Sequence, residues 1–224
     1  MKKILIVLII MLTGNCWITY AQRIDNHLEP ARGIFDVSDH SFEYYYMMRK
    51  LLFNGLDGNP EIRFLEMPSF TAESVLDIEF DRKKSKYYMK YHIAVESIGY
   101  PSIKKKVKVI KFETEIEKES VELLKTLFFI ATSQVKYMPP PEINADGTRE
   151  YIVMADGTRY FFSTNEYYKT RAGMTHSPSN GSKMQKLVDV GYKLVELAKS
   201  GKAMVSIDTA FKEEIEKLME ELTE

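Results

Sequence analysis

Residues 175–182 hold the densest group of side chains that could do chemistry, because one histidine and three serines stand within this short segment. The segment joins a predicted strand to a predicted helix, and exposed backbone N–H groups at such a junction can bind an anion. His176 could add a response to pH, since histidine titrates near neutrality. We therefore name His176, Ser177 and Ser179 as candidate ligand-binding residues. The alternative is a simple turn in which Ser179 or Ser182 caps the following helix.

Elsewhere the sequence contains no recognisable catalytic or metal-binding motif. The Gly-x-Ser-x-Gly pattern of serine hydrolases does not occur, and no glycine-rich phosphate loop is present. The histidines stand too far apart for a paired zinc motif: His27, His40, His92 and His176. We therefore predict no catalytic residues, no metal and no cofactor. The 32 acidic residues leave open a pair of carboxylates brought together by folding, as in glycosidases.

The N-terminus has the pattern of a secretory signal peptide. Two lysines precede an apolar run over residues 4–12. As a helix this run would rise only ~14 Å, against a hydrocarbon core of ~30 Å. Small residues predict cleavage after Ala21, so residues 1–21 form the predicted signal peptide, with lipidation of Cys16 as a minor alternative. We expect a periplasmic or extracellular protein without stable membrane insertion after cleavage.

Cleavage would leave a chain that depends on a packed core. It removes Cys16, the only cysteine, so disulfides cannot contribute. The formal net charge of −1 predicts no basic surface for nucleic acid, which we do not expect as a partner. Residues 22–37 lack a sustained period and are predicted to be extended. Residues 38–224 are predicted to form a single domain, with a possible sub-boundary at the three prolines 139–141.

Hydrophobic periodicity predicts an α+β fold: an antiparallel β-meander sheet packed against two long amphipathic helices, with flanking N- and C-terminal helices. Short links between the strands leave no room for parallel crossovers. Strands are expected around residues 62–64, 76–80, 87–95 and 107–112. Helices are expected over residues 38–52, 115–137 and 182–199, and after a cap at Asp208 or Thr209.

The strand at residues 87–95 shows the cleanest alternation, and its phase places His92 beside Lys90 on the polar face. We expect one face of the sheet to be exposed to solvent, with His92 on that face and neither a metal ligand nor a base. A lysine cluster predicts that the next strand lies at a sheet edge, where lysine blocks unwanted pairing. The cluster consists of Lys104, Lys105, Lys106, Lys108 and Lys111.

A second group of strands is predicted around Asp156 and Gly157. This Asp-Gly pair separates two β-rich runs, residues 149–154 and 159–163, which is typical of a tight hairpin. A third run over residues 167–174 extends the predicted meander and leads into the helix at 182–199.

The last third of the chain resembles a loose group of uncharacterised exported proteins of Gram-negative gut bacteria. The resemblance rests on the order of five short motifs: Asp156-Gly157-Thr158, Tyr160-Phe161-Phe162-Ser163, Ser177-Pro178, Gly181-Ser182-Lys183 and Leu187-Val188. These motifs are structural, so the resemblance implies an extracytoplasmic single-domain protein and no particular mechanism.

From export and the lack of a catalytic motif we expect a non-catalytic binding protein whose partner is another protein. An immunity-type role, in which the chain neutralises a toxin, is one form of this hypothesis. The alternative is a carboxylate-dependent hydrolase acting on glycan or peptide. Two carboxylates facing each other in a deep cleft would favour the hydrolase, whereas a flat apolar patch would favour the binding protein.

Overall fold

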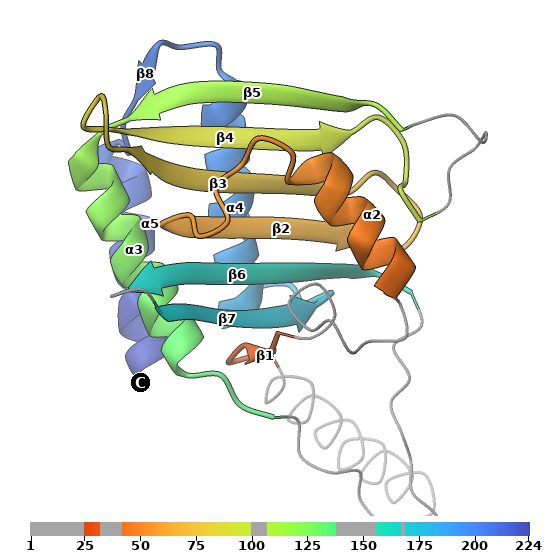
Figure 1. Cartoon of the computed structure of the whole chain (residues 1–224). Coiled ribbons are helices and arrows are strands. Elements are labelled where there is room, and N and C mark those ends of the chain that lie inside the picture. The colour runs from red at the N-terminus through yellow and green to blue at the C-terminus, as the bar shows by residue number, and fades with distance from the viewer. Residues whose placement is uncertain (1–24, 32–41, 100–106, 138–155, 167–168) are drawn as a thin grey trace, which may run out of the picture.

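The computed structural model describes residues 25–31, 42–99, 107–137, 156–166 and 169–224. This part of the chain forms an α+β fold with one mixed sheet of eight strands and four helices (Figure 1). The strands are β1 (Glu29–Pro30), β2 (Ile62–Pro68), β3 (Ser74–Asp81), β4 (Lys86–Ala94), β5 (Val109–Ile116), β6 (Thr158–Glu166), β7 (Lys169–His176) and β8 (Met204–Val205). The helices are α2 (Phe42–Leu52), α3 (Lys118–Ser133), α4 (Lys183–Lys199) and α5 (Thr209–Thr223).

The sheet is more complex than the predicted meander. Strands β2 to β5 follow each other as antiparallel neighbours, which confirms the first half of the prediction. After α3, however, the β6–β7 hairpin joins the sheet on the far side of β2, giving the order β1-β7-β6-β2-β3-β4-β5-β8. The short β8 pairs with β5 in parallel, so the sheet is mixed and the prediction of a purely antiparallel sheet is wrong.

Helices α3, α4 and α5 pack on one face of the sheet and bury the larger core. Each presents one apolar stripe, as the periodicity predicts, and local caps begin two of them. Ser182 accepts a hydrogen bond from the Gln185 N–H at 3.1 Å, and Asp208 accepts one from the Phe211 N–H at 2.8 Å. The predicted start of α3 at residue 115 is wrong, because that part of the chain still belongs to β5 and pairs with β4 and β8.

Helix α2 covers part of the opposite face (Figure 1). Its inner residues Tyr45, Met48 and Leu52 pack over β2, β3 and β6 in a smaller core. The prediction that this face is exposed to solvent is therefore wrong for β3, which is buried on both faces from Ser74 to Glu79.

His92 lies beneath α2, and the prediction that it faces solvent is also wrong. The side chain is only 4% exposed, and its Nδ1 lies 2.5 Å from the carbonyl oxygen of Leu52, the last residue of α2. Burial lowers the pKa of His92, although the hydrogen bond to Leu52 raises it in part. His92 thus helps to hold the end of α2 on the sheet.

The pair Asp156-Gly157 does not form the predicted hairpin turn within this sheet, because β2 and β7 occupy both edges of β6. Gly157 instead adopts φ = 132° directly before β6, and its carbonyl oxygen accepts a hydrogen bond from the Ser69 N–H at 2.9 Å. Several predicted features lie outside the described residues: the signal peptide with Cys16, the run at 149–154, the prolines at 139–141 and the lysines at 104–106. Within residues 22–37, Glu29 and Pro30 form β1 and pair with β7.

Candidate functional site

The predicted ligand-binding residues lie where β7 ends, and contacts within the chain surround them. The Ser179 N–H donates to the Asp25 carboxylate at 2.8 Å, so this carboxylate takes the place that we predicted for a bound anion. The Ser177 Oγ accepts a hydrogen bond from the Thr158 N–H at 2.9 Å. His176 stands opposite Arg159, and its pKa is lowered by burial and by the arginine charge. Binding of an external anion at this cluster stays a prediction.

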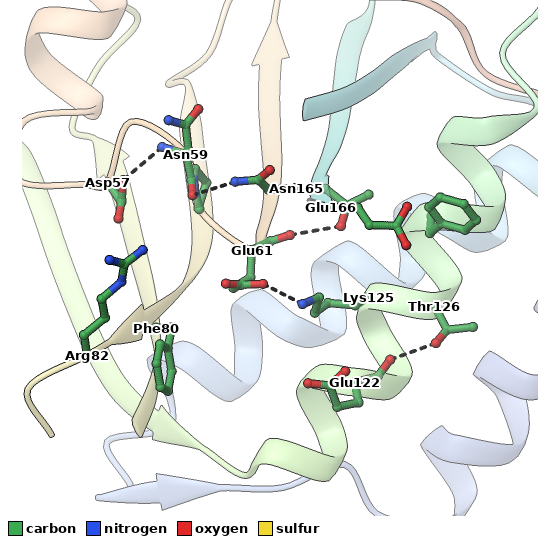
Figure 2. Close-up of a pocket in the computed structure, with 13 residues that line it drawn as sticks. Asp57, Asn59, Glu61, Phe80, Arg82, Glu122, Lys125, Thr126, Asn165 and Glu166 are labelled. Atoms are coloured by element: carbon green, nitrogen blue, oxygen red, sulfur yellow. Dashed lines mark hydrogen bonds and ion pairs between the residues drawn. The ribbon is translucent and has the colours of Figure 1, made fainter. Parts of the chain in front are cut away.

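A larger candidate site lies at one end of the sheet, beside the first half of α3 (Figure 2). It is a groove with a volume of about 790 Å³, which we call the acidic groove. The loop before β2, the last residues of β3 and β6, and α3 form its walls. The lining residues are Asp57, Asn59, Pro60, Glu61, Phe80, Arg82, Glu122, Lys125, Thr126, Phe129, Thr164, Asn165 and Glu166.

Hydrogen bonds from neighbouring strands hold the loop that forms one wall. The Glu61 carbonyl oxygen accepts from the Asn165 N–H at 3.1 Å and from the Thr164 hydroxyl at 3.0 Å, which fixes the loop against β6. The Asp57 N–H donates to the Glu79 carboxylate at 2.6 Å. The Asp57 carbonyl oxygen accepts from the Arg63 guanidinium at 3.0 Å. The groove therefore has a wall that is in place before any ligand arrives.

The side chains in the acidic groove carry more negative than positive charge. Glu61 and Lys125 form an ion pair at 2.6 Å across the groove (Figure 2). Burial alone would lower the pKa of Lys125, but the hydrogen bond to Glu61 and the charges of Glu61 and Glu122 raise it overall. Among the described residues, Asp57, Glu122 and Glu166 form no ion pair within 4.0 Å, and Arg82 is the second cation of the lining. This excess of negative charge favours a positively charged ligand.

One polar atom of the lining lacks a partner. The Asn165 Oδ1 is buried, and no described group donates a hydrogen bond to it, whereas the Nδ2 lies 3.5 Å from the Asn59 carbonyl oxygen. Because this atom is buried, it is not open to a ligand in the groove, and the carboxylates of the lining are the groups that a cation can contact. Phe80, which is 39% exposed, adds an aromatic ring that a cation can also contact.

The hydroxyl groups of the lining are engaged in structural hydrogen bonds. Thr126 donates to the Glu122 carbonyl oxygen at 2.9 Å, and Thr164 donates to that of Glu61. As far as the described residues go, the lining contains carboxylates, amides and cations but no histidine, serine or cysteine. Over the described ranges, no group of three or more His, Cys, Asp or Glu residues is arranged to hold a metal ion. The arrangement suits recognition of a cation by hydrogen bonds and charge.

Sequence reasoning did not find the acidic groove. Asp57 and Asn59 follow the first predicted helix and belong to no predicted site, while Lys125 and Asn165 belong to elements far along the chain. The available signal was the dense run of turn formers at residues 57–60, since loops packed on a rigid scaffold often carry binding residues.

In the part of the chain that the structure describes, every helix is too short or too polar to cross a membrane. Comparison of the sequence with models of protein families and with curated proteins gives no match, and comparison with solved structures gives none either.

Proposed function

We propose that this chain is an exported, non-catalytic binding protein that takes a positively charged side chain of a protein partner into the acidic groove. The observation that carries the proposal is the groove itself, because carboxylates outnumber cations among the described residues of its lining. An arginine or lysine side chain supplies both the charge and the N–H donors that such a lining needs. Export is inferred from the N-terminal sequence pattern. An immunity-type interaction is one form that the proposal can take.

The expected contribution of the charges is moderate. Pairs between partly exposed groups contribute about 0.2–1 kcal/mol each, and salt screens them. A cation that pairs with both Glu122 and Glu166 would therefore gain roughly 0.4–2 kcal/mol, which corresponds to about a 2- to 30-fold change in Kd. This is large enough to measure in variants, and the rest of the affinity must come from other contacts with the partner.

The alternative hypothesis, a carboxylate-dependent hydrolase, would need a groove carboxyl group whose pKa is raised so that it can act as the general acid. Glu61 is instead held by Lys125 at 2.6 Å, and its backbone fixes the end of β6. The carboxyl group whose pKa burial raises, that of Asp77, does not line the groove and is hydrogen-bonded to Arg63. We therefore favour binding over hydrolysis.

Fluorescence anisotropy with labelled tetra-arginine and tetra-glutamate peptides tests the proposal. We expect the cationic peptide to bind and the anionic peptide not to bind, with affinity falling at high salt. The double variant Glu122→Gln/Glu166→Gln should weaken binding about 2- to 30-fold. The matched control is Glu213→Gln/Glu220→Gln, which removes the same charge from exposed positions on α5. Equal losses in the two double variants would show that binding reflects net charge and would refute the assignment to the groove.

A further inference from the structure

Most of the outer edge of β5 has no neighbouring strand in the described part of the chain. Strand β5 lies near one border of the sheet, and the short β8 is bonded to its C-terminal end (Figure 1). This pairing involves only Glu115 and Ile116, so residues 109–113 face outward without a described strand beside them. An open edge of this kind is a template for pairing with another extended segment.

The hydrogen bonds to β8 show which backbone groups of β5 point outward. The Glu115 N–H donates to the Ala203 carbonyl oxygen at 3.2 Å, so the backbone groups of Glu115 point away from β4. Backbone direction alternates along a strand, and the N–H and C=O groups of Val109, Lys111 and Glu113 therefore point outward as well. Val109 and Lys111 form no backbone hydrogen bond on this side with any described residue, so their outward donors and acceptors are available.

The side chains of β5 add apolar surface to this edge. Ile110 is 50% exposed, although it pairs with Ile93 of β4 on the face that carries α3, α4 and α5. On the same face, the half-buried Phe112 lies 5.9 Å from Tyr91, measured between the ring centroids. Cross-strand apolar pairs stabilise a sheet, so a strand added beside β5 would cover Ile110. The edge thus offers both backbone groups and an apolar contact.

The edge is complementary to itself when two β5 strands pair antiparallel about a two-fold axis at Ile110. Val109 of each copy then faces Lys111 of the other, and each such pair exchanges both of its backbone hydrogen bonds. Ile110 faces its own counterpart, so the two exposed side chains cover each other. Lys108 faces Phe112, and no two like charges stand directly opposite each other.

Other two-fold registers fit less well. An axis at Lys111 would place two lysines directly opposite each other, which is unfavourable. With an axis at Phe112, Val109 would enter the place that β8 of the other copy occupies beside its own β5. An axis at Val109 would place Ile110 opposite Lys108, without an apolar neighbour across the axis. The register centred on Ile110 avoids all of these conflicts.

We propose that two copies of this chain form a symmetric dimer by pairing β5 with β5, so that one sheet runs through both copies. The described lining of the acidic groove includes no residue of β5, so this inference does not depend on the proposed function. One short strand pair buries less surface than a standard interface, so we expect a reversible dimer with a Kd of roughly 10–100 μM.

Sedimentation equilibrium of the chain without residues 1–21 tests the association at total concentrations of about 1–500 μM, over which we expect a change from monomer to dimer. Lys111→Pro removes an outward N–H and leaves the hydrogen bonds to β4 intact, so it should weaken the dimer at least about ten-fold. The matched control Lys111→Thr keeps this N–H and should dimerise like the unmodified chain. Both variants lose the contact of the Lys111 Nζ with the Asn54 carbonyl oxygen, and circular dichroism checks that both fold.

Cysteine cross-linking tests the register. Removal of residues 1–21 leaves no native cysteine, so Ile110→Cys would carry a single thiol. In the proposed register the two Cα atoms at position 110 lie about 4.5 Å apart, a distance that a disulfide can span. The control Glu113→Cys is also at an exposed position, but its two thiols would lie roughly 20 Å apart. We expect oxidised glutathione to cross-link Ile110→Cys at least about ten-fold faster than Glu113→Cys.

Each measurement can overturn the proposal. A monomer at every concentration excludes the dimer. Equal weakening by Lys111→Pro and Lys111→Thr excludes pairing through the backbone, and equal cross-linking rates for the two cysteine variants exclude the register centred on Ile110. Loss of the dimer in Lys111→Pro but not in Lys111→Thr, together with rapid cross-linking at position 110, supports the proposal.

Discussion

Helix α4 approaches the Phe64 side chain of β2 closely at Gly191, and we predict that Gly191→Ala destabilises the protein. A β-carbon at this position would lie 2.7 Å from Cε1 and Cζ of Phe64. Carbon atoms in contact prefer ~3.5–4.0 Å, so the ring would have to move by roughly 0.8 Å or more. Phe64 is only 1% exposed and packs against Phe162, with ring centroids 5.2 Å apart, which leaves little space for such a movement.

Two opposing effects set the change in the free energy of unfolding caused by Gly191→Ala. Alanine in a helix interior is favoured over glycine by about 1 kcal/mol. Overpacking a buried site costs about 1–3 kcal/mol, and the rigid aromatic surroundings place Gly191→Ala toward the upper half of that range. The net expectation is a free energy of unfolding lowered by roughly 1–2 kcal/mol. For a domain of this size, each kcal/mol lowers the Tm by about 2–4 °C.

Urea denaturation followed by circular dichroism measures this effect on the chain without residues 1–21. In a Phe64→Leu background the clash is removed, so Gly191→Ala should there be neutral or stabilising by up to about 1 kcal/mol. The control Gly58→Ala adds a β-carbon with no atom within 4 Å and should change stability by less than about 0.5 kcal/mol. If Gly191→Ala costs the same in both backgrounds, contact with the Phe64 ring is not the cause.

Three further predictions concern buried polar groups and the start of β6. Glu73 is 1% exposed and accepts hydrogen bonds from the Tyr44 hydroxyl at 2.8 Å and the Ile98 N–H at 2.7 Å. Glu73→Gln should therefore lower the free energy of unfolding by roughly 1.5–3 kcal/mol in urea, and a midpoint equal to that of Glu213→Gln would contradict this. Burial raises the pKa of Asp77 from 3.8 to about 6, although the hydrogen bond and the charge of Arg63 lower it in part. Protonation of Asp77 therefore stabilises the folded state fully below pH 3.8, and this stabilisation is lost as the pH rises through about 6. This amounts to up to roughly 3 kcal/mol, and Asp77→Asn should lack this slope in a plot of stability against pH. Gly157→Val should lower the Tm more than Gly181→Val, because both glycines have positive φ but only at Gly157 would a β-carbon lie 2.2 Å from the Ser177 Oγ. Equal Tm values would exclude the contact as the reason.

The elements that depend on local signals could be predicted from the sequence. The apolar spacing of α4 and its cap at Ser182 lie within one stretch of chain, and the structure has both in place. The same holds for α5 and Asp208. The meander from β2 to β5 was also predictable, because short links between consecutive strands leave antiparallel pairing as the only choice.

The burial of the polar face of the sheet could not be predicted, because alternation along a strand does not reveal which element covers each face. Asp77 and His92 have the polar types expected of an exposed face, yet both are buried. Asp77 is satisfied by two hydrogen bonds from Arg63, at 2.8 and 2.6 Å, and His92 by the end of α2. These partners lie 14 and 40 positions away in the sequence, so no local pattern contains them.

The acidic groove was beyond sequence reasoning for a related reason. It exists only because β6 joins the sheet beside β2, which brings Asn165 to Glu61 across 104 positions of sequence. The Asp-Gly pair before β6 predicted a hairpin with residues 149–154. That hairpin would make residues 149–154, and not β2, the neighbour of β6. A strong local turn signal can thus predict the wrong adjacent strand when the turn lies at the start of a strand that pairs with a more distant segment.

Glu61 links the fold to the proposed binding site, and this decides which residues can test function. Its carbonyl oxygen fixes the end of β6 through Asn165 and Thr164, and its carboxylate holds Lys125 of α3. Replacing Glu61 would remove a groove charge and leave Lys125 without its partner, so lost binding could reflect a displaced α3. Glu122 has no ion-pair partner among the described residues and is exposed, so its charge can be removed without breaking a contact between elements. Loss of cation binding in a Glu122 variant of unchanged Tm is therefore evidence about the ligand, whereas the same loss in a Glu61 variant is not.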